Sequence, residues 1–320
     1  SGLLQASKDI FLRSAAFEFS SSFFRVKGLD SGNGKVLING IEMNKVYDGR
    51  AQWSNWGGLN DVLRNQEFSN GLTASDVTFG GVLGATNMNT RASLQRPGTR
   101  LSYSSSNRSY VHRAMATHTT GISKSGWAMT FSASRRAGVE GFNAGTSYNA
   151  YSVFTSIEKK INNHHSINFT GIFTPNRRGK SSPNTQEVID LKGIEFNEYW
   201  GSLNGRKLNS RIKEVVEPIL MLNHYWDISE NATLQTNASY QFGKIGNSRL
   251  DFNGGANPSP TYYQTLPSYF LRTNDLAGAY TAQENFVNYG QLDWYRIFDA
   301  NRTNISAGLN NAYVLYEDRN

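Results

Sequence analysis

The chain has 320 residues, enough for one large domain or two ordinary ones, and its 12% aromatic content excludes a disordered chain. No apolar run approaches the roughly 18 residues that a transmembrane helix needs. The absence of cysteine excludes disulfides and thiolate metal sites, and the net charge of +7 is spread out rather than gathered into dense runs, which argues against nucleic-acid binding.

Residues 1–96 show no regular alternation and are expected to form a small mixed α/β domain. A turn between two of its strands contains Gly32 and Gly34, which tolerate the positive φ of tight turns. The expected elements are, in chain order, a helix capped by its first residue, a hairpin of two strands, a helical turn, and a glycine-rich segment that becomes a strand: Ser7–Phe19, Phe23–Gly28 with Lys35–Asn39, Leu59–Leu63, and Phe79–Arg91.

From residue 97 onward, segments of about ten residues alternate apolar and polar side chains. Leu234 and Tyr240 fall on one face of such a segment, and Gln235 falls on the other. Because successive side chains of a strand point to opposite faces, this pattern predicts strands with one apolar face. Nine candidates show it: Arg100–Ser106, Tyr110–Thr120, Trp127–Ser134, Tyr148–Ile161, Ser166–Phe173, Val215–Ile228, Thr233–Lys244, Phe286–Phe298 and Asn304–Glu317.

The connections between these strands alternate in length. Short polar turns are expected at Ile122–Gly126, Asn162–His165, Ser229–Ala232 and Asp299–Arg302, and long connections at Arg136–Ser147, Asn176–Glu214 and Arg249–Asn285. Such alternation is typical of a transmembrane β-barrel with periplasmic turns and external loops. A soluble β-sandwich with an apolar core is the alternative. Aromatic residues at the strand ends, such as Tyr110 and Trp127, suit membrane-interface girdles and favour the barrel.

Three segments resemble the plug signature of TonB-dependent outer-membrane receptors. Phe24–Gly28 followed by Val36–Asn44 is similar to the Arg-Gly and Leu-x-Asp/Asn-Gly strand ends of that signature, and Phe79–Arg91 is similar to its Gly-Gly-hydrophobic-Ile-Asn-x-x-Thr segment. The sequence departs from the pattern at two places. Lys27-Gly28 stands where the family has Arg-Gly, and Leu63–Phe68 replaces the family's Arg-Gly-Pro step. The resemblance is to the Bacteroidota-like, carboxypeptidase-regulatory-like and plug-containing type of the family.

The resemblance implies a mainly β fold, a transmembrane antiparallel β-barrel with an N-terminal mixed α/β plug domain. Residues 1–96 would be the plug, incomplete at its N-terminus, and residues 97–320 the first part of the barrel with long extracellular loops. The family's barrel has 22 strands, and an odd number such as nine cannot close a bacterial barrel. The chain start, Ser1-Gly2-Leu3-Leu4, is no secretion signal. The chain is therefore expected to be a fragment that lacks the coupling box and later strands.

The function that the resemblance implies is plug-gated, energy-coupled import of a ligand across the outer membrane. The implied partners are an inner-membrane TonB-type energy-coupling complex, outer-membrane lipid, outer-membrane partner subunits, and an external siderophore, cobalamin, saccharide or peptide. No cofactor is implied. The altered step at Arg64–Phe68 motivates an alternative, a structural subunit of an outer-membrane complex that has lost transport. An enzyme is disfavoured because no catalytic constellation stands out.

The candidate ligand site follows from the same resemblance. It places Met43–Gly58 at the plug apex, where basic and aromatic groups suit an anionic or sugar-like ligand; these are Lys45, Tyr47, Arg50, Trp53 and Trp56. The alternative for the two tryptophans is packing in the plug core. In the outer loops, the candidate ligand contacts are Tyr199, Trp200, Tyr262 and Tyr263.

Two further motifs resemble functional sites but fit ordinary structural roles better. Gly179-Lys180-Ser181 resembles the end of a phosphate-binding loop. That loop needs a glycine five residues earlier, where this chain has Thr174, so a basic outer loop is expected instead. His164-His165 could hold a metal, but adjacent side chains in a strand face opposite ways, so no metal site is predicted.

Overall fold

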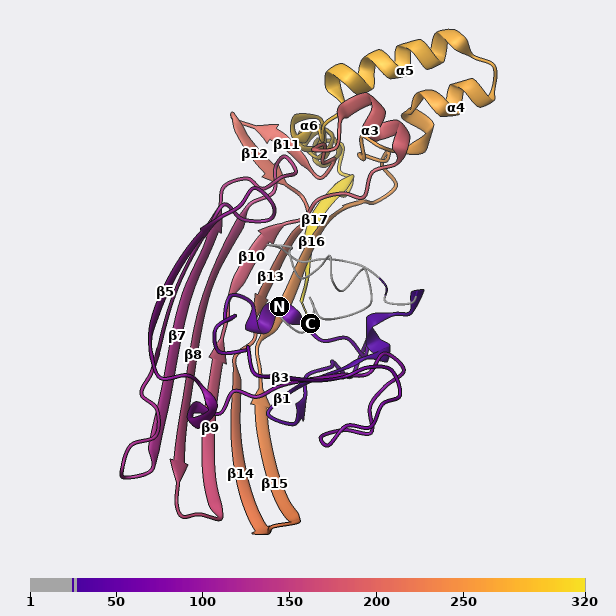
Figure 1. The fold of residues 1–320 in the computed structure, drawn as a ribbon. Coiled ribbons are helices and arrows are strands. Elements are labelled where there is room, and N and C mark those ends of the chain that lie inside the picture. Colours follow the sequence, from indigo (N-terminus) through magenta and orange to yellow (C-terminus); the bar gives the residue numbers. More distant parts are fainter. Residues whose placement is uncertain (1–24, 26–27, 320) are drawn as a thin grey trace.

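The computed structural model describes residue 25 and residues 28–319 of the chain, and the helix expected at Ser7–Phe19 lies outside them. The fold is mainly β, as expected, with a small sheet near the N-terminus and a large antiparallel sheet after it. Figure 1 shows the large sheet as a tall curved wall, with the small sheet against its concave side. The described part of the chain contains no helix long and apolar enough to cross a membrane.

The small sheet has four strands in the order β2-β1-β4-β3. Its strands are β1 (Lys35–Ile38), β2 (Ile41–Glu42), β3 (Gln66–Ser69) and β4 (Ala85–Met88), and three short 3-10 helices accompany them: η2 (Ser31–Asn33), η3 (Trp53–Trp56) and η4 (Ala92–Leu94). Only the β1–β4 pair is parallel. The strand expected at Phe23–Gly28 lies mostly outside the described residues. Among the described residues, β1 pairs with β2 on one edge and with β4 on the other.

The large sheet, called the wall below, has eleven strands. They are β5 (Gly98–Ser105), β6 (His112–Thr119), β7 (Trp127–Gly138), β8 (Tyr148–Lys160), β9 (His165–Phe173), β10 (Asn176–Gly179), β13 (Ile212–Val216), β14 (Ile219–Ser229), β15 (Ala232–Gln241), β16 (Lys244–Phe252) and β17 (Tyr313–Arg319). The first five expected strands and Thr233–Lys244 are confirmed as β5–β9 and β15. Neighbours along the chain pair antiparallel across the sheet.

Three long strands of the wall are interrupted at about the same level. β9 and β10 both pair with β8, and they are separated by Thr174-Pro175. β13 and β14 are separated by Glu217-Pro218, so the single strand expected at Val215–Ile228 is two. β15 and β16 are separated at Gly243, whose φ is +123°. Proline has no N–H for the ladder and glycine tolerates such φ values, so these residues account for the interruptions.

The long connections gather at one end of the wall, and the short turns lie at the other (Figure 1). Turns of a few residues join β6 to β7, β8 to β9 and β14 to β15, which confirms three of the four short turns expected from the sequence. The long connections carry most of the helices: α3 (Gln186–Lys192), a hairpin of β11 (Trp200–Leu203) and β12 (Arg206–Asn209), η5 (Tyr263–Thr265), α4 (Pro267–Arg272), α5 (Leu276–Tyr289) and α6 (Trp294–Ser306).

Two expected strands are wrong. Phe286–Phe298 spans the end of α5 and the start of α6, and Asn304–Glu317 contains the end of α6 before β17 begins. The expected turn at Asp299–Arg302 is likewise inside α6. The helices are favoured by aspartate caps: the Asp275 and Asp293 side chains accept hydrogen bonds from the first-turn N–H groups of α5 and α6. A short apolar run can match both the strand and the helix period.

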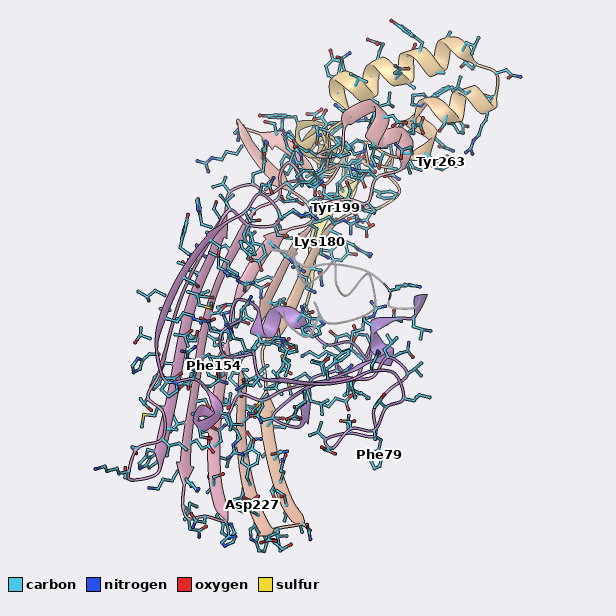
Figure 2. All side chains as sticks on the ribbon, in the orientation of Figure 1. Phe79, Phe154, Lys180, Tyr199, Asp227 and Tyr263 are labelled. Atoms are coloured by element: carbon cyan, nitrogen blue, oxygen red, sulfur yellow. The ribbon has the colours of Figure 1, made fainter. Side chains whose placement is uncertain are left out.

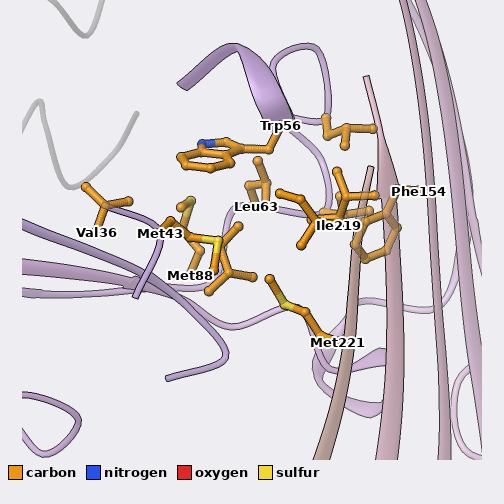
Figure 3. Packing of buried hydrophobic residues seen from close by; sticks show 12 residues of the cluster. Val36, Met43, Trp56, Leu63, Met88, Phe154, Ile219 and Met221 are labelled. Carbon is orange, nitrogen blue, oxygen red and sulfur yellow. The ribbon is translucent and has the colours of Figure 1, made fainter. Parts of the chain in front are cut away.

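The N-terminal unit, residues 28–97, packs its core against the wall. Figure 3 shows Trp56, Leu63 and Met88 opposite Phe154, Ile219 and Met221, and this cluster is almost fully buried. The concave face of the wall therefore includes an apolar patch among its polar side chains. The opposite face exposes apolar side chains throughout, for example Leu222, Leu234 and Tyr240.

Candidate functional site: the junction of the N-terminal unit and the wall

A buried ion pair joins the N-terminal unit to one of the interruptions in the wall. The Nζ of Lys45 lies 2.7 Å from Oε1 of Glu217, and Asn55 donates a hydrogen bond of 2.7 Å to the other carboxylate oxygen. Both charged side chains are mostly buried, at 16% and 11% exposure. At the neighbouring interruption, Thr174 donates to the Ser54 carbonyl over 2.8 Å. The interrupted strands thus present polar groups to the loop that contains the candidate plug-apex residues.

A second ion pair lies nearer the short turns. Nη2 of Arg91 lies 2.6 Å from Oε1 of Glu158, a side chain only 2% exposed, and the guanidinium stacks on Tyr225 at 4.0 Å from the ring centre. The other oxygen of Glu158 accepts from the Ser93 N–H over 2.9 Å. Glu158 is therefore bound on both oxygens by the segment that connects β4 to β5.

Between the two ion pairs, the junction is built from buried amides and hydroxyls. Asn39 donates to Thr90 over 2.8 Å, to Asn223 over 3.3 Å and to Thr170 over 3.4 Å. Asn223 in turn donates to Asn237 over 2.8 Å, which confirms that this polar face of β15 points toward the N-terminal unit. The junction is therefore held mainly by directional polar contacts around its apolar patch.

The backbone comes closest to the wall at Gly57 and Gly58. Arg136 donates to the Gly57 carbonyl over 3.0 Å, and Ser152 donates to it over 2.7 Å. Gly58 has a φ of +82°, and a Cβ there would meet the Ser134 Oγ at 2.6 Å. Only glycine combines this conformation with this approach.

The structure separates the candidate plug-apex residues into three groups. Lys45 forms an ion pair with Glu217, and Arg50 forms an ion pair with Asp30. Trp56 lies in the core with 3% exposure. Of the two interpretations given for Trp56, ligand contact and packing in the core, its position therefore matches the second.

Tyr47 and Trp53 are the candidate plug-apex residues that remain open to a ligand. They are 64% and 54% exposed, and Trp53 packs edge-on against Trp56 with the ring centres 5.6 Å apart. Burial raises the pKa of the Tyr47 hydroxyl, and Asp48 and Glu217 add to the effect, so the phenol stays protonated. An uncharged donor and an indole face are suited to stacking and hydrogen bonding.

A basic cavity lies on the concave side of the wall above these residues. It has a volume of about 490 Å³, and its lining includes Arg178, Lys180 and Lys213. Lys213 donates to the side chain of Gln52, beside Trp53, over 3.0 Å. Burial lowers the pKa of the Lys180 ammonium, and Arg178 and Arg211 lower it further. Figure 2 shows Lys180 below the outer connections, on the side of the N-terminal unit.

The candidate outer-loop residues fall into two places. Tyr199 packs against Arg211 at 5.2 Å, and Arg211 accepts a backbone hydrogen bond from Lys180, so Tyr199 lies near the basic cavity. Trp200 begins β11 and is half-buried under Lys207. Tyr262 and Tyr263 pack edge-on with ring centres 4.9 Å apart just before α4. Figure 2 shows Tyr263 apart from Tyr199.

The sequence pattern does not identify the basic side chains of the wall as site residues. Lys180 stands out only as part of Gly179-Lys180-Ser181, and Arg178 and Lys213 fall inside a segment expected to be one long loop. The sequence feature that could indicate this basic site is the i, i+2 spacing of Arg178 and Lys180. That spacing has meaning only once the segment is known to be a strand end.

The adjacent histidines do not meet one another. The His164 ring contacts the Asp227 carbonyl, and His165 stacks on His224 with their ring nitrogens 3.1 Å apart. Within residues 28–319, no group of three or more potential ligands of the His, Cys, Asp and Glu type could hold a metal ion.

No protein-family profile matches the chain. No curated protein matches it at a significant level.

Several solved structures resemble part of the fold. The ferric-catecholate import receptor Fiu of E. coli K12 aligns with a TM-score of 0.48 at 13% identity, over 72% of this chain and 32% of that one. The ferripyoverdine receptor of the Pseudomonas aeruginosa outer membrane gives 0.46 at 10%, over 70% and 29%. The siderophore receptor PirA of Acinetobacter baumannii gives 0.44 at 12%, over 71% and 34%. The chain spans about a third of the length of these structures.

Proposed function

We propose that the protein imports a ligand across the outer membrane, with the N-terminal unit as a movable plug. The observation that carries this proposal is the polar junction. Asn39, Lys45 and Arg91 bind Asn223, Glu217 and Glu158 of the wall through hydrogen bonds and ion pairs. Water can replace such contacts one by one, whereas a fully apolar interface would lose its burial energy on opening.

The proposal assigns a role to each part of the chain. Residues 1–96 act as the plug, and residues 97–320 supply part of a membrane-spanning barrel in the cell outer membrane. The exposed apolar face of the wall would contact lipid. Movement of the plug would draw on an inner-membrane TonB-type coupling complex, as the plug-like segments of the sequence imply. The Bacteroidota-like type is part of the same proposal.

The ligand site of this importer is assigned to the space between the N-terminal unit and the long connections. Tyr47 and Trp53 supply exposed aromatic surface there, with Lys45, Arg50 and Trp56 holding their loop in place. Tyr199 lies on the outer side of the same space, near Lys180. Trp200, Tyr262 and Tyr263 would meet the ligand earlier, in the outer loops.

A disulfide lock tests the proposal. The Thr90 and Thr170 hydroxyls lie 3.4 Å apart across the junction, both side chains are fully buried, and the 320 residues contain no cysteine that could compete. Thr90→Cys with Thr170→Cys in the full-length protein should form a bridge that holds the plug to the wall.

Uptake is measured in a deletion strain with labelled ferric siderophore, cyanocobalamin, oligosaccharide and peptide. The wild-type protein should restore the uptake of at least one, the oxidised double variant should not, and a reductant should recover it. Each single cysteine variant is the control. Import by the oxidised variant at the wild-type rate would contradict the proposal, as would a deletion that changes no uptake.

The α4 and α5 helices of the last long connection support a second candidate function, an assembly subunit. The α4–α5 hairpin extends away from the wall (Figure 1), and α5 exposes Leu276, Tyr280 and Tyr289 at 67–81%. Exposed apolar surface of this kind marks interaction sites. Purification in mild detergent separates the two functions: an assembly subunit should elute in a stoichiometric complex, and a lone importer should not.

A further inference from the structure

Two cations face each other directly across neighbouring strands of the wall. Arg178 of β10 is the register partner of Lys213 of β13, so both side chains lie on the same face. Lys213 contacts Gln52 of the N-terminal unit, which shows that this face is the concave one. Lys180 is two residues beyond Arg178 and donates to Asn247, the register partner of Lys213 on β16.

This arrangement costs stability rather than adding it. Like charges directly opposite each other on neighbouring strands repel and destabilise the pairing. Among the described residues, no carboxylate lies within ion-pair distance of Arg178, Lys180 or Lys213. Glu217, the carboxylate on the adjoining interruption, is already bound by Lys45 and Asn55.

The hydrogen-bond partners of the two lysines are neutral. Lys180 donates to the amide oxygen of Asn247 over 2.8 Å, and Lys213 donates to that of Gln52 over 3.0 Å. These contacts fix the positions of the ammonium groups without cancelling their charge. No carboxylate of the described residues is therefore paired with the cluster, which lines a cavity of about 490 Å³ together with the aromatic side chains of Phe142 and Tyr148.

We propose that this cavity binds a small polyanion that carries two or more carboxylate or phosphate groups. Arg178 would take one oxyanion in its planar fork, and the ammonium groups of Lys180 and Lys213 would take a second as point charges. Binding neutralises the repulsion between Arg178 and Lys213, so the bound anion recovers the stability that the empty cluster loses. The inference names the ligand class of the proposed importer and rests on that function for its biological meaning.

The test measures binding in detergent, without transport, so its failure is distinct from failure of the import proposal. The full-length protein is titrated with citrate and with inorganic pyrophosphate by calorimetry, with glucose as the neutral comparison. One or both anions should bind, glucose should not, and the affinity should fall with rising salt. The two anions distinguish a carboxylate from a phosphate ligand.

The variants assign the binding to the cluster. Arg178→Gln with Lys213→Gln should weaken anion binding at least tenfold, which corresponds to about 1.4 kcal/mol. The matched control is Arg177→Gln, because Arg177 is the next residue on β10 and its side chain lies on the opposite face. That variant should bind as the wild type does.

Thermal unfolding of the double variant shows whether a loss of anion binding comes from the missing cations or from misfolding. Because the double variant removes a repulsion, its midpoint of thermal unfolding without anion should equal or exceed that of the wild type, and citrate or pyrophosphate should no longer raise it. The inference is overturned if neither anion binds the wild-type protein, if the double variant binds with unchanged affinity, or if Arg177→Gln lowers the affinity as much. A double variant that unfolds earlier than the wild type would also overturn it, because the pair would then be stabilising.

Discussion

Arg91 and Glu158 connect the end of the N-terminal unit to the part of the wall near the short turns through an ion pair of 2.6 Å. They are 67 residues apart in the sequence. Glu158 is buried to 98% and has both oxygens bound, one by the Arg91 guanidinium and the other by the Ser93 N–H. Such a pair fixes where the N-terminal unit meets the wall.

Removing the carboxylate of Glu158 should loosen the N-terminal unit. Glu158→Ala leaves the Arg91 guanidinium without its partner, and breaking a buried pair on one side typically costs about 3–5 kcal/mol. Backbone amide hydrogen exchange in residues 88–95 should therefore speed up by more than tenfold, while exchange in α5 stays unchanged. The control is Glu230→Ala, in the exposed β14–β15 turn. Equal protection of residues 88–95 in both variants would show that the pair does not hold the unit.

The close approach of Gly58 should make it intolerant of any side chain. Gly58→Ala places a Cβ 2.6 Å from the Ser134 Oγ and 2.8 Å from the Arg136 Nε, and we expect a destabilisation of about 1–3 kcal/mol beyond the strain of its positive φ. Gly193 provides a matched control: its φ is +83°, and open space surrounds the position of its Cβ. Urea unfolding of the two alanine variants isolates the contact with the wall. Similar losses in both would mean that φ alone explains them.

The two faces of β15 should respond differently to charge. Ala238 is paired with Leu222 on the outward face, whereas Ser239 is paired with Met221 on the face toward the N-terminal unit. If the outward face contacts lipid, Ala238→Arg near the bilayer midplane should cost about 2–4 kcal/mol, and Ser239→Arg much less. The comparison is made by urea titration of protein folded into lipid vesicles. Equal costs would argue against a lipid-facing surface.

The two ends of the wall should lie on opposite sides of the membrane. Strands reverse direction at each connection, so the connections that contain Pro183 and Pro260 share one end, and the turns that contain Asn163 and Asn231 share the other. An epitope inserted at Pro183 or Pro260 should bind antibody on intact cells. One at Asn163 or Asn231 should bind only after the outer membrane is opened. The reverse pattern would place the long connections in the periplasm.

Much of the wall could be predicted from the sequence because the strand pattern is local. The alternation in Thr233–Lys244 predicted both the strand and its polar inner face, and Asn237 confirms that face through its contact with Asn223. Three of the four expected short turns were predictable for the same reason. The pattern failed at Phe286–Phe298, where local apolar spacing fits a strand and a helix equally, and where the caps by Asp275 and Asp293 decide for helices.

The candidate site depended on contacts that no local pattern encodes. Lys45 and Glu217 are 172 residues apart, and Arg178 and Lys213 become neighbours only through the register of β10 on β13. The sequence alone determined which segments alternate and where aromatic and basic residues occur. Only the tertiary structure decided which of those residues are buried, such as Trp56, which are committed to ion pairs, such as Lys45, and which cations face a cavity together, because pairing and burial depend on how distant segments pack.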